Sequence, residues 1–417
     1  MHTLHNTPPG KTAKHAHSHA CDPAALAALD TSQTMQPPQV RAVSLRRERW
    51  RRREVSGKFL RPLAKTNETP FLKQVRPAQC SWTLGQSVGI MHDGSRPAGY
   101  TGIERCSSIW ACPHCSAVIR AGRAAEIQQA VEAHQQQGGE LLFFTGTLRH
   151  HQGDDLETTL DAVLEAWRKM TGNRPWKERK QRHAISGYIR SIEVTHGTNG
   201  WHPHAHVLLL LDEKMSADEL ADFRNWIFNQ WSNSVEKSGG KRPNEQGLDL
   251  QQVDKKGKVL AKYISKIQDE KKWTAGAELA RADVKNGRGN SITPFQLLDE
   301  ETDIDANKRG ALWREYYLAT KGRRAITWSR GLKQRYEIGE QTDEDILDET
   351  ESTTLVWRTS AKTYRTARMR GAVTLAIALE LAENEAWAEL EKLLPSDWRP
   401  DERKKRSAGQ PPGRKHL

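Results

Sequence analysis

The sequence predicts an α+β fold, an antiparallel central sheet covered by helices, and two observations lead to this prediction. Between residues 138 and 275, segments rich in aromatic and β-branched residues alternate with segments of helical periodicity. Two of the strand-like segments are separated by the turn signal Thr198-Asn199-Gly200, so we expect them to form a hairpin and run antiparallel. A doubly wound parallel sheet would instead need a long crossover between neighbouring strands.

Local sequence signals predict where each helix and strand of this region begins and ends. The first helix ends at Gly138-Gly139, since glycine readily takes the left-handed conformation that closes a helix. The segment ELLFFTGTLR that follows has the composition of a strand. The next helix has acidic residues in its first turn and basic residues in its last, and a later one starts at Ser216. The expected helices are 120–137, 154–170, 216–235 and 258–269, and the expected strands are 140–149, 185–196, 204–211 and 248–253.

Other regions flank this central one. Residues 1–56 lack an apolar period and are expected to form a disordered arm, His-rich at first and basic at its end. Residues 75–137 form a Cys-rich segment followed by a helix, and residues 138–335 hold the central sheet with a C-terminal extension. An acidic linker at 340–352 leads to a helical region at 353–400, with an amphipathic helix at 374–394, and to a basic disordered tail at 401–417.

The charge of the chain indicates a polyanionic partner. Lys and Arg number 64 against 52 Asp and Glu among 417 residues, a formal net charge of +12. A merely basic, soluble surface is the alternative to a nucleic-acid partner. The basic run Arg46, Arg47, Arg49, Arg51, Arg52 and Arg53 is either a solvated arm or an arm that contacts DNA phosphates.

Composition also excludes other classes of protein. The apolar run at residues 207–211 is far shorter than the ~20 residues of a membrane-spanning helix, and no run in the sequence approaches that length. The 14 Trp residues argue against a wholly disordered chain. The N-terminal residues show no secretory signal, so we expect a cytoplasmic protein in a reducing compartment.

A cluster of histidines indicates a metal site. In Trp201-His-Pro-His-Ala-His206, side chains of a strand alternate, so His204 and His206 point to the same face and can reach one divalent ion. Glu193 on the preceding strand would meet them across the hairpin, ahead of His202 and then His196 as third ligand. A carboxylate favours Mg²⁺ or Mn²⁺ over Zn²⁺ and leaves positions open for phosphate. Histidines that are merely hydrogen-bonded at the start of a strand are the alternative.

A tyrosine on the expected helix 258–269 is the candidate nucleophile. Tyr263 lies beside Lys262 in sequence and beside Lys266 on the helix surface, and both cations would favour phenolate and hold a phosphate. Next to a metal ion, Tyr263 could attack a phosphodiester and retain a covalent 5′-phosphate. Without the metal site, the same pattern would only indicate an amphipathic surface helix.

Cysteines indicate a second site. Cys106, Cys112 and Cys115 have C-x5-C-x2-C spacing, and the Cys-Pro-His-Cys turn is typical of a knuckle that holds Zn²⁺. Cys80 or His114 could supply the fourth ligand. A set of reduced, partly buried thiols without a metal is the alternative.

Three motifs in order carry a resemblance to a known family. FFTGTLRH at 143–150, GWHPHAHVLL at 200–209 and AKYISK at 261–266 resemble the motifs of plasmid rolling-circle replication initiators, which belong to the HUH endonuclease superfamily. The segment from Cys106 to Cys115 is similar to one that often precedes the first motif. The resemblance covers residues 100–335 and identifies 138–335 as a nicking-closing endonuclease domain.

The resemblance implies a function and its partners. The protein would nick one strand at a plasmid origin, stay on the 5′ end through a phosphotyrosine link and leave a 3′-OH primer. His204 and His206 would bind the metal, and Tyr263 would be the nucleophile. The implied partners are origin DNA, as a single-stranded nick site and a duplex binding site, the host helicase and replication machinery, and further copies of the chain.

One departure from the family pattern concerns termination. Many initiators of this branch carry a glutamate four residues before the tyrosine, where this chain has Val259, which cannot activate a water. Asp254 and Glu270 are the nearby carboxylates. A single-tyrosine HUH transposase and a non-catalytic zinc-knuckle DNA-binding protein remain as alternatives. A relaxase is disfavoured, because its tyrosine usually precedes the histidines.

Overall fold

The computed structural model describes residues 37–64, 75–253, 291–349 and 353–397. The chain divides into two units, residues 1–41 and 42–417, and both sheets belong to the second. The expected helix at 258–269, with Tyr263 and Lys266, lies outside the described residues, as do residues 1–36 and the tail at 401–417.

A five-stranded antiparallel sheet forms the centre of the structure and confirms the predicted fold class. Its strand order is β6-β3-β5-β4-β7, so β5 lies in the middle. The strands are β3 (Glu140–Thr147), β4 (Ile185–Gly197), β5 (Gly200–Leu211), β6 (Leu248–Gln252) and β7 (Ile326–Trp328). Each pair of neighbours in it is antiparallel.

The predicted hairpin joins β4 to β5. Gly197 pairs with Gly200, whose positive φ of 84° is a conformation that glycine adopts without strain. β5 starts four residues earlier than the expected strand and includes Pro203, which pairs with Val194. Proline is tolerated there because β3 pairs with β5 only as far as His204, so Pro203 has a neighbouring strand on one side alone.

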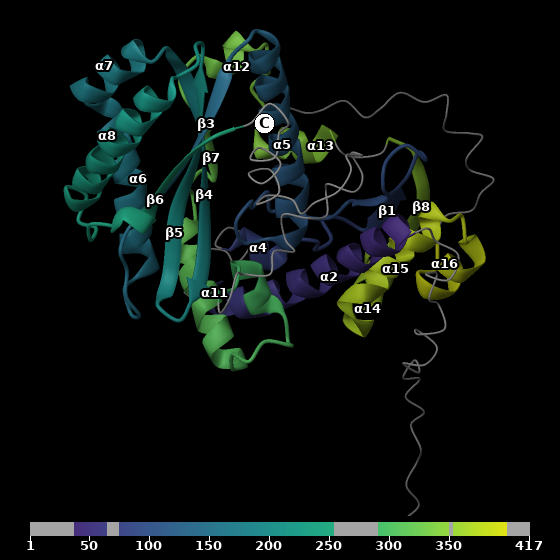
Figure 1. Ribbon diagram of the computed structural model, residues 1–417. Coiled ribbons are helices and arrows are strands. Elements are labelled where there is room, and N and C mark those ends of the chain that lie inside the picture. The colour runs from purple at the N-terminus through teal and green to yellow at the C-terminus, as the bar shows by residue number, and fades with distance from the viewer. Residues whose placement is uncertain (1–36, 65–74, 254–290, 350–352, 398–417) are drawn as a thin grey trace, which may run out of the picture. The chain divides into compact units, whose positions relative to one another are not determined.

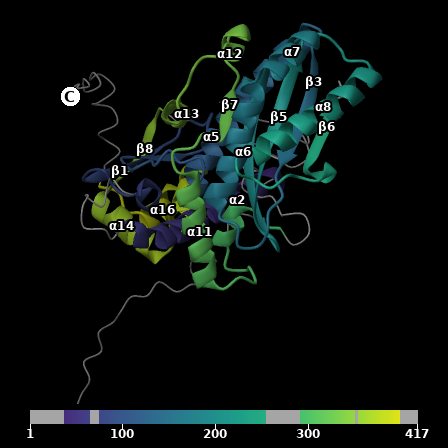
Figure 2. The ribbon, with the colours of Figure 1, turned by 90° about the vertical axis from the view of Figure 1, so that its left-hand side faces the viewer.

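Helices α6 (Leu156–Gly172), α7 (Arg174–Arg182) and α8 (Ala217–Glu236) lie on one face of the sheet (Figures 1 and 2). Phe144 of β3 packs between Trp167 of α6 and Trp231 of α8, with ring centroids 5.6 Å apart in both pairs. The indole of Trp231 also donates a 2.7 Å hydrogen bond to the carbonyl of Thr147. Ser216 caps α8 through a capping box with Glu219, as its N-cap position predicted.

Helix α5 (Pro113–Gln136) lies on the opposite face (Figure 1). Its Ile127 and Val131 are buried in one cluster with Leu208 and Leu210 of β5. α5 starts seven residues before the predicted helix, because Cys112 caps it and Pro113 occupies the first helical position. The prediction of an acidic linker at 340–352 is wrong for the central part of this segment. That part forms α13 (Asp343–Glu349), in which Ile346 and Leu347 are buried.

A second sheet joins the two ends of the described chain. Its strand order is β2-β1-β8, with β1 (Ser87–Met91), β2 (Gly99–Thr101) and β8 (Leu355–Ser360) (Figure 1). The expected helical region at 353–400 therefore begins with a strand, and it folds together with the Cys-rich segment. The amphipathic helix expected at 374–394 is two helices, α15 (Ala372–Glu383) and α16 (Trp387–Leu393), since Glu385 between them has a φ of 54°.

The basic segment before the Cys-rich region is a helix, α2 (Pro37–Leu60), where we expected a disordered arm. Trp50 is buried and meets the ring of Tyr100 edge-on at 5.8 Å, and the hydroxyl of Ser56 donates to the carbonyl of Ala111. The expectation failed for residues 37–56 because acidic partners of Arg46, Arg47 and Arg52 lie more than 240 residues away in sequence.

The remaining elements connect these layers. They are η2 (Arg61–Ala64), α4 (Arg76–Gln79), η3 (Glu245–Gly247), η4 (Pro294–Leu298), α11 (Ala306–Thr320), α12 (Leu332–Arg335) and α14 (Ala361–Arg370). Within the described ranges, no helix combines the length and the apolar character that crossing a membrane requires.

Candidate functional site

Two histidines and a glutamate meet on the face of the sheet that α5 covers in part. Glu193 of β4 pairs in register with His204 of β5, and His206 is two residues further along the same face. His206 Nε2 lies 2.7 Å from Glu193 Oε2, and His204 Nε2 lies 3.4 Å from the same oxygen. One ligand atom from each residue lies within 4.8 Å of the other two. The structure thus brings together the three residues that the sequence suggested as metal ligands.

His206 is held in place from both sides of its ring. Its Nδ1 lies 3.0 Å from the hydroxyl of Thr145, and the ring stacks on Phe143 at 5.6 Å with an interplanar angle of 12°. Because Thr145 engages Nδ1, Nε2 is the nitrogen presented to Glu193. Thr145 and Phe143 both belong to the FFTGT segment of β3, so this segment positions the ring of His206 in the candidate site.

His202 and His196 lie outside this group. His202 Nε2 lies 2.8 Å from the hydroxyl of Thr147, and its ring stacks on His150 at 4.5 Å. Burial, reinforced by the neighbouring His204, lowers the pKa of His202 to about 3, so the ring is neutral. His196 meets the ring of Trp201 edge-on at 4.8 Å. Glu193, rather than either histidine, is therefore the third member of the candidate site.

The donor set fits a divalent ion that also binds a substrate. Two imidazole nitrogens and one carboxylate oxygen leave further coordination positions open, and side-chain exposures of 24% for Glu193 and 13% for His204 open the group on one side. A carboxylate with open positions suits Mg²⁺ or Mn²⁺ together with phosphate oxygens. The arrangement can thus hold an ion at a place that a phosphodiester can reach.

Sequence reasoning missed the residues that support the site. Thr145 and Thr147 pair with His206 and His204, so their side chains share the face of the histidines. Asp249 of β6 pairs with Thr145 and shares this face as well. Alternation within FFTGT was the available signal, but the register of β3 against β5 was needed to use it.

The four cysteines near the start of α5 form a separate group. Cys80, Cys106, Cys112 and Cys115 are all buried, and their sulfurs lie within 4.8 Å of one another. His114, the other candidate for fourth ligand, is not a member, because its ring packs against Trp50 at 5.2 Å.

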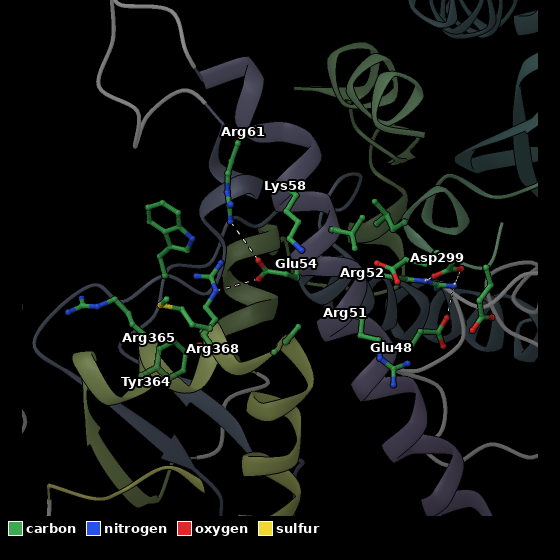
Figure 3. A pocket seen from close by; sticks show the side chains of 18 of the residues that line it. Glu48, Arg51, Arg52, Glu54, Lys58, Arg61, Asp299, Tyr364, Arg365 and Arg368 are labelled. Atoms are coloured by element: carbon green, nitrogen blue, oxygen red, sulfur yellow. Dashed lines mark hydrogen bonds and ion pairs between the residues drawn. The ribbon is translucent and has the colours of Figure 1, made fainter. Parts of the chain in front are cut away.

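Most of the basic run on α2 is directed into the protein. Arg46 and Arg47 pair with Glu383 and Glu380 of α15. Arg52 pairs with Glu48 and Asp299 (Figure 3). Arg53 donates to the carbonyl of Cys80 and pairs with Glu54, and Arg49 is half-buried. Of the six arginines only Arg51 has an exposed side chain. Arg46, Arg47, Arg52 and Arg53 thus have acidic partners within the fold or buried side chains, whereas Arg51 faces solvent.

Arg51 lines a cavity of about 1410 Å³ between α2, α14 and residues 298–301 (Figure 3). Lys58 and Arg61 of the same helical segment and Arg365 and Arg368 of α14 line it too. Several acids, among them Glu48, Glu54 and Asp299, share the wall, so the cavity has a mixed charge.

The fold and the site define a basic α+β protein whose central hairpin carries a candidate metal site. Comparison with known proteins then identifies its family. Residues 103–368, well over half of the chain, match the family described as Replication protein. The chain belongs to this family of plasmid replication initiator proteins.

Individual relatives agree with this assignment. Protein rep from Streptomyces lividans is 31% identical over 307 aligned residues, which cover 59% of this chain and 67% of the relative. Neomycin resistance protein from Streptomyces cyanogenus is 32% identical over 135 residues, covering 26% of this chain and 31% of the relative. Protein rep from a Bacillus species is 27% identical over 173 residues, covering 40% and 53%. The chain thus spans only about a third to a half of the last two relatives. No solved structure matches the chain.

Proposed function

We propose that this protein initiates rolling-circle replication of a plasmid by nicking one strand at the origin, as an enzyme of the HUH endonuclease superfamily. The observation that carries the proposal is the convergence of His204 Nε2 and His206 Nε2 on one oxygen of Glu193. Membership in the replication protein family supports it independently.

In this proposal Glu193, His204 and His206 hold a Mg²⁺ or Mn²⁺ ion. When bound, the ion would draw negative charge from the scissile phosphate and orient it for in-line attack. Thr145 keeps the Nε2 of His206 directed at the site through its contact with Nδ1. Burial keeps the neighbouring His202 neutral, so it adds no repelling charge beside a cation.

Tyr263 is the proposed nucleophile. Its phenolate oxygen forms a bond to phosphorus, the bond from phosphorus to the 3′ oxygen breaks, and the 3′ oxygen takes up a proton to become the primer hydroxyl. Lys262 and Lys266 would stabilise the phenolate and hold the phosphate. The covalent 5′-phosphotyrosine conserves the energy of the broken bond for rejoining.

The length of the chain allows Tyr263 to reach the ion. β6 runs away from the site, because Asp249 pairs with Thr145 beside His206 whereas Gln252 pairs with Leu142. At ~3.4 Å per strand residue, β6 travels about 14 Å from its start to its end. Eleven residues lead from Gln252 to Tyr263. Even at the ~1.5 Å per residue of a helix, that number of residues can cover about the same length.

Origin DNA would approach through phosphate contacts with exposed cations. Arg51, Lys58, Arg61 and Arg365 are the exposed basic side chains around the cavity beside α2. They replace the inward-facing arginines of the basic run as candidates for backbone contacts, which position DNA without reading its sequence. The host helicase and replication machinery would act after nicking.

Termination needs a group other than Val259. Glu270, or Tyr263 of a second copy of the chain, would complete the release of the 5′ end. Both residues lie outside the described part of the chain, so this assignment rests on the sequence alone.

The experiment that tests the proposal uses supercoiled plasmid carrying the gene and the DNA that flanks it. Incubation with the protein and Mg²⁺ should yield nicked circles with protein attached after denaturation. Retardation of the plasmid without nicking would contradict the proposal and favour a non-catalytic DNA-binding protein. Joining of two different DNA molecules would instead indicate a transposase.

A further inference from the structure

We propose that Cys80, Cys106, Cys112 and Cys115 hold one structural Zn²⁺ ion, with Cys80 as the fourth ligand. The sulfur of Cys80 lies 3.7 Å from that of Cys115 and 3.5 Å from that of Cys112, and the Cys106 and Cys115 sulfurs are 3.8 Å apart. Four sulfurs bound at ~2.3 Å to the corners of a tetrahedron around one ion lie ~3.8 Å from one another. The side chains thus already have the spacing of a zinc-thiolate site.

Disulfide bonds do not explain the cluster. A disulfide joins two sulfurs at ~2.05 Å, far less than the measured separations. All four cysteines are free thiols, with exposures between 0 and 5%. Packing of small apolar side chains would explain buried cysteines singly, but it does not require four of them from three chain segments to converge on one point.

The start of α5 supplies a backbone hydrogen-bond donor to one of the four sulfurs. Cys112 caps this helix, and its sulfur accepts a 3.5 Å hydrogen bond from the backbone N–H of Cys115. Partial positive charge at a helix N-terminus stabilises anionic groups. The Pro113 ring fixes the first turn between the two ligands. Burial raises the pKa of the Cys112 thiol, so the amide hydrogen bond offsets only part of the cost of a thiolate there, and a bound cation would supply the rest.

The structure decides between the two candidates for fourth ligand. Cys80 ends the short helix α4, and its carbonyl accepts a hydrogen bond from Arg53, which fixes the segment against α2. His114 packs against Trp50 instead. The ion would therefore fasten α4, the loop after β2 and α5 to one another.

This site also braces the strand that carries the histidines. Trp110, between Cys106 and Cys112 in the sequence, donates a 2.8 Å hydrogen bond to the carbonyl of Arg323. Its ring meets Tyr316 edge-on at 6.2 Å, and Tyr316 stacks on Trp201 at 5.9 Å. Trp201 precedes His204 by three residues on β5. The zinc site thus supports the hairpin of Glu193, His204 and His206 through packed aromatic rings. This structural role does not depend on whether the protein nicks DNA.

The test measures metal in the full-length protein purified under reducing conditions. We expect about one Zn²⁺ per chain, retained on dialysis, as for a closed structural site. Replacement of the zinc by Co²⁺ should give the sulfur-to-cobalt charge-transfer absorption and the intense visible bands of a tetrahedral thiolate site. Cys80→Ser should lower zinc content and remove or strongly weaken these bands.

Three control variants sharpen the result. Cys21→Ser removes the one cysteine outside the cluster, and His114→Ala removes the rejected ligand, so both should keep wild-type zinc content and the cobalt spectrum. His204→Ala should also keep the zinc, which separates this site from the histidine site. A wild-type protein that takes up neither Zn²⁺ nor Co²⁺ under reducing conditions would overturn the proposal even if the Cys80 variant fails to fold. Loss of the spectrum in His114→Ala with retention in Cys80→Ser would overturn the assignment of the fourth ligand.

Discussion

His206 Nε2 and His204 Nε2 lie 2.7 and 3.4 Å from the same oxygen, Oε2 of Glu193. Because these two nitrogens and this oxygen lie so close together, all three atoms can bind one divalent cation. The first prediction follows from this geometry.

Removal of any of the three ligands should weaken binding of Mn²⁺. We expect His204→Ala, His206→Ala and Glu193→Ala each to lower the affinity ~100-fold or more, because even a group that only orients a ligand contributes about 10–100-fold. Titration calorimetry with Mn²⁺ measures the affinity directly. His196→Ala is the matched control, since its ring packs on Trp201 outside the site. An equal loss in that control would refute the ligand assignment.

Thr145 should act through His206. Thr145→Val keeps the shape of the side chain but removes the hydroxyl that contacts Nδ1, so we expect Mn²⁺ affinity to fall about 10–100-fold. Thr145→Ser keeps the hydroxyl and should bind Mn²⁺ nearly as the wild type does. If both variants behave alike, the hydroxyl has no part in orienting the ring.

The arginines of α2 should separate into stabilising and DNA-binding residues. Arg47 pairs with Glu380, whose side chain is fully buried, and burial raises the pKa of Glu380 while Arg47 opposes that rise. Arg47→Ala leaves this acid without its partner and should lower the free energy of unfolding by about 3–5 kcal/mol. Arg51→Ala changes an exposed residue and should alter stability by less than ~0.5 kcal/mol.

Arg51→Ala, which should leave stability nearly unchanged, should instead weaken DNA binding. If Arg51 contacts a phosphate, Arg51→Ala lowers the slope of log affinity against log salt by about one counterion. Filter binding at several salt concentrations measures that slope, and urea denaturation measures stability. An unchanged salt slope in Arg51→Ala would exclude the phosphate contact.

His134 should make the protein less stable in acid. The ring is buried, with Nδ1 2.7 Å from the hydroxyl of Tyr336 and Nε2 3.0 Å from the carbonyl of Glu140, and burial lowers its pKa below 6.5. As the pH falls through about 6.5, the unfolded chain binds a proton at this histidine that the folded chain does not bind. The free energy of unfolding therefore decreases as the pH falls.

A comparison of variants isolates this contribution. Urea denaturation at about pH 7.5 and about pH 5.5 should show a smaller loss of stability in His134→Gln than in the wild type, because other titrating groups cancel in the difference. Equal losses would mean that His134 is protonated to the same extent in both states.

Local patterns in the sequence were enough to predict the hairpin and its site. Alternation along β4 and β5, with one turn between them, is enough to predict that Glu193 lies opposite His204. Thr145 could not be assigned in the same way, since its position depends on the register of β3 against β5, which no short turn fixes.

Long-range partners explain the failures. The basic run was expected to be disordered because its local sequence does not reveal its distant acidic partners. These partners are Glu380, Glu383 and Asp299. In the same way β8 pairs with β1, which lies more than 260 residues earlier in the sequence. The β-branched and aromatic residues of 353–360 are a local strand signal, but the sheet that they join could not be recognised without that distant partner.

The central claim, that Tyr263 attacks a phosphate held at the Glu193, His204 and His206 site, is tested most directly by locating the DNA on the protein. After reaction with the plasmid and Mn²⁺, nuclease and protease digestion followed by mass spectrometry should find a nucleotide attached to the peptide that contains Tyr263. Tyr263→Phe should give no adduct while it still binds the DNA, and His206→Ala should give little adduct at limiting Mn²⁺. A wild-type amount of adduct in Tyr263→Phe, or a nucleotide mapped to Tyr188 or Tyr316, would contradict the account.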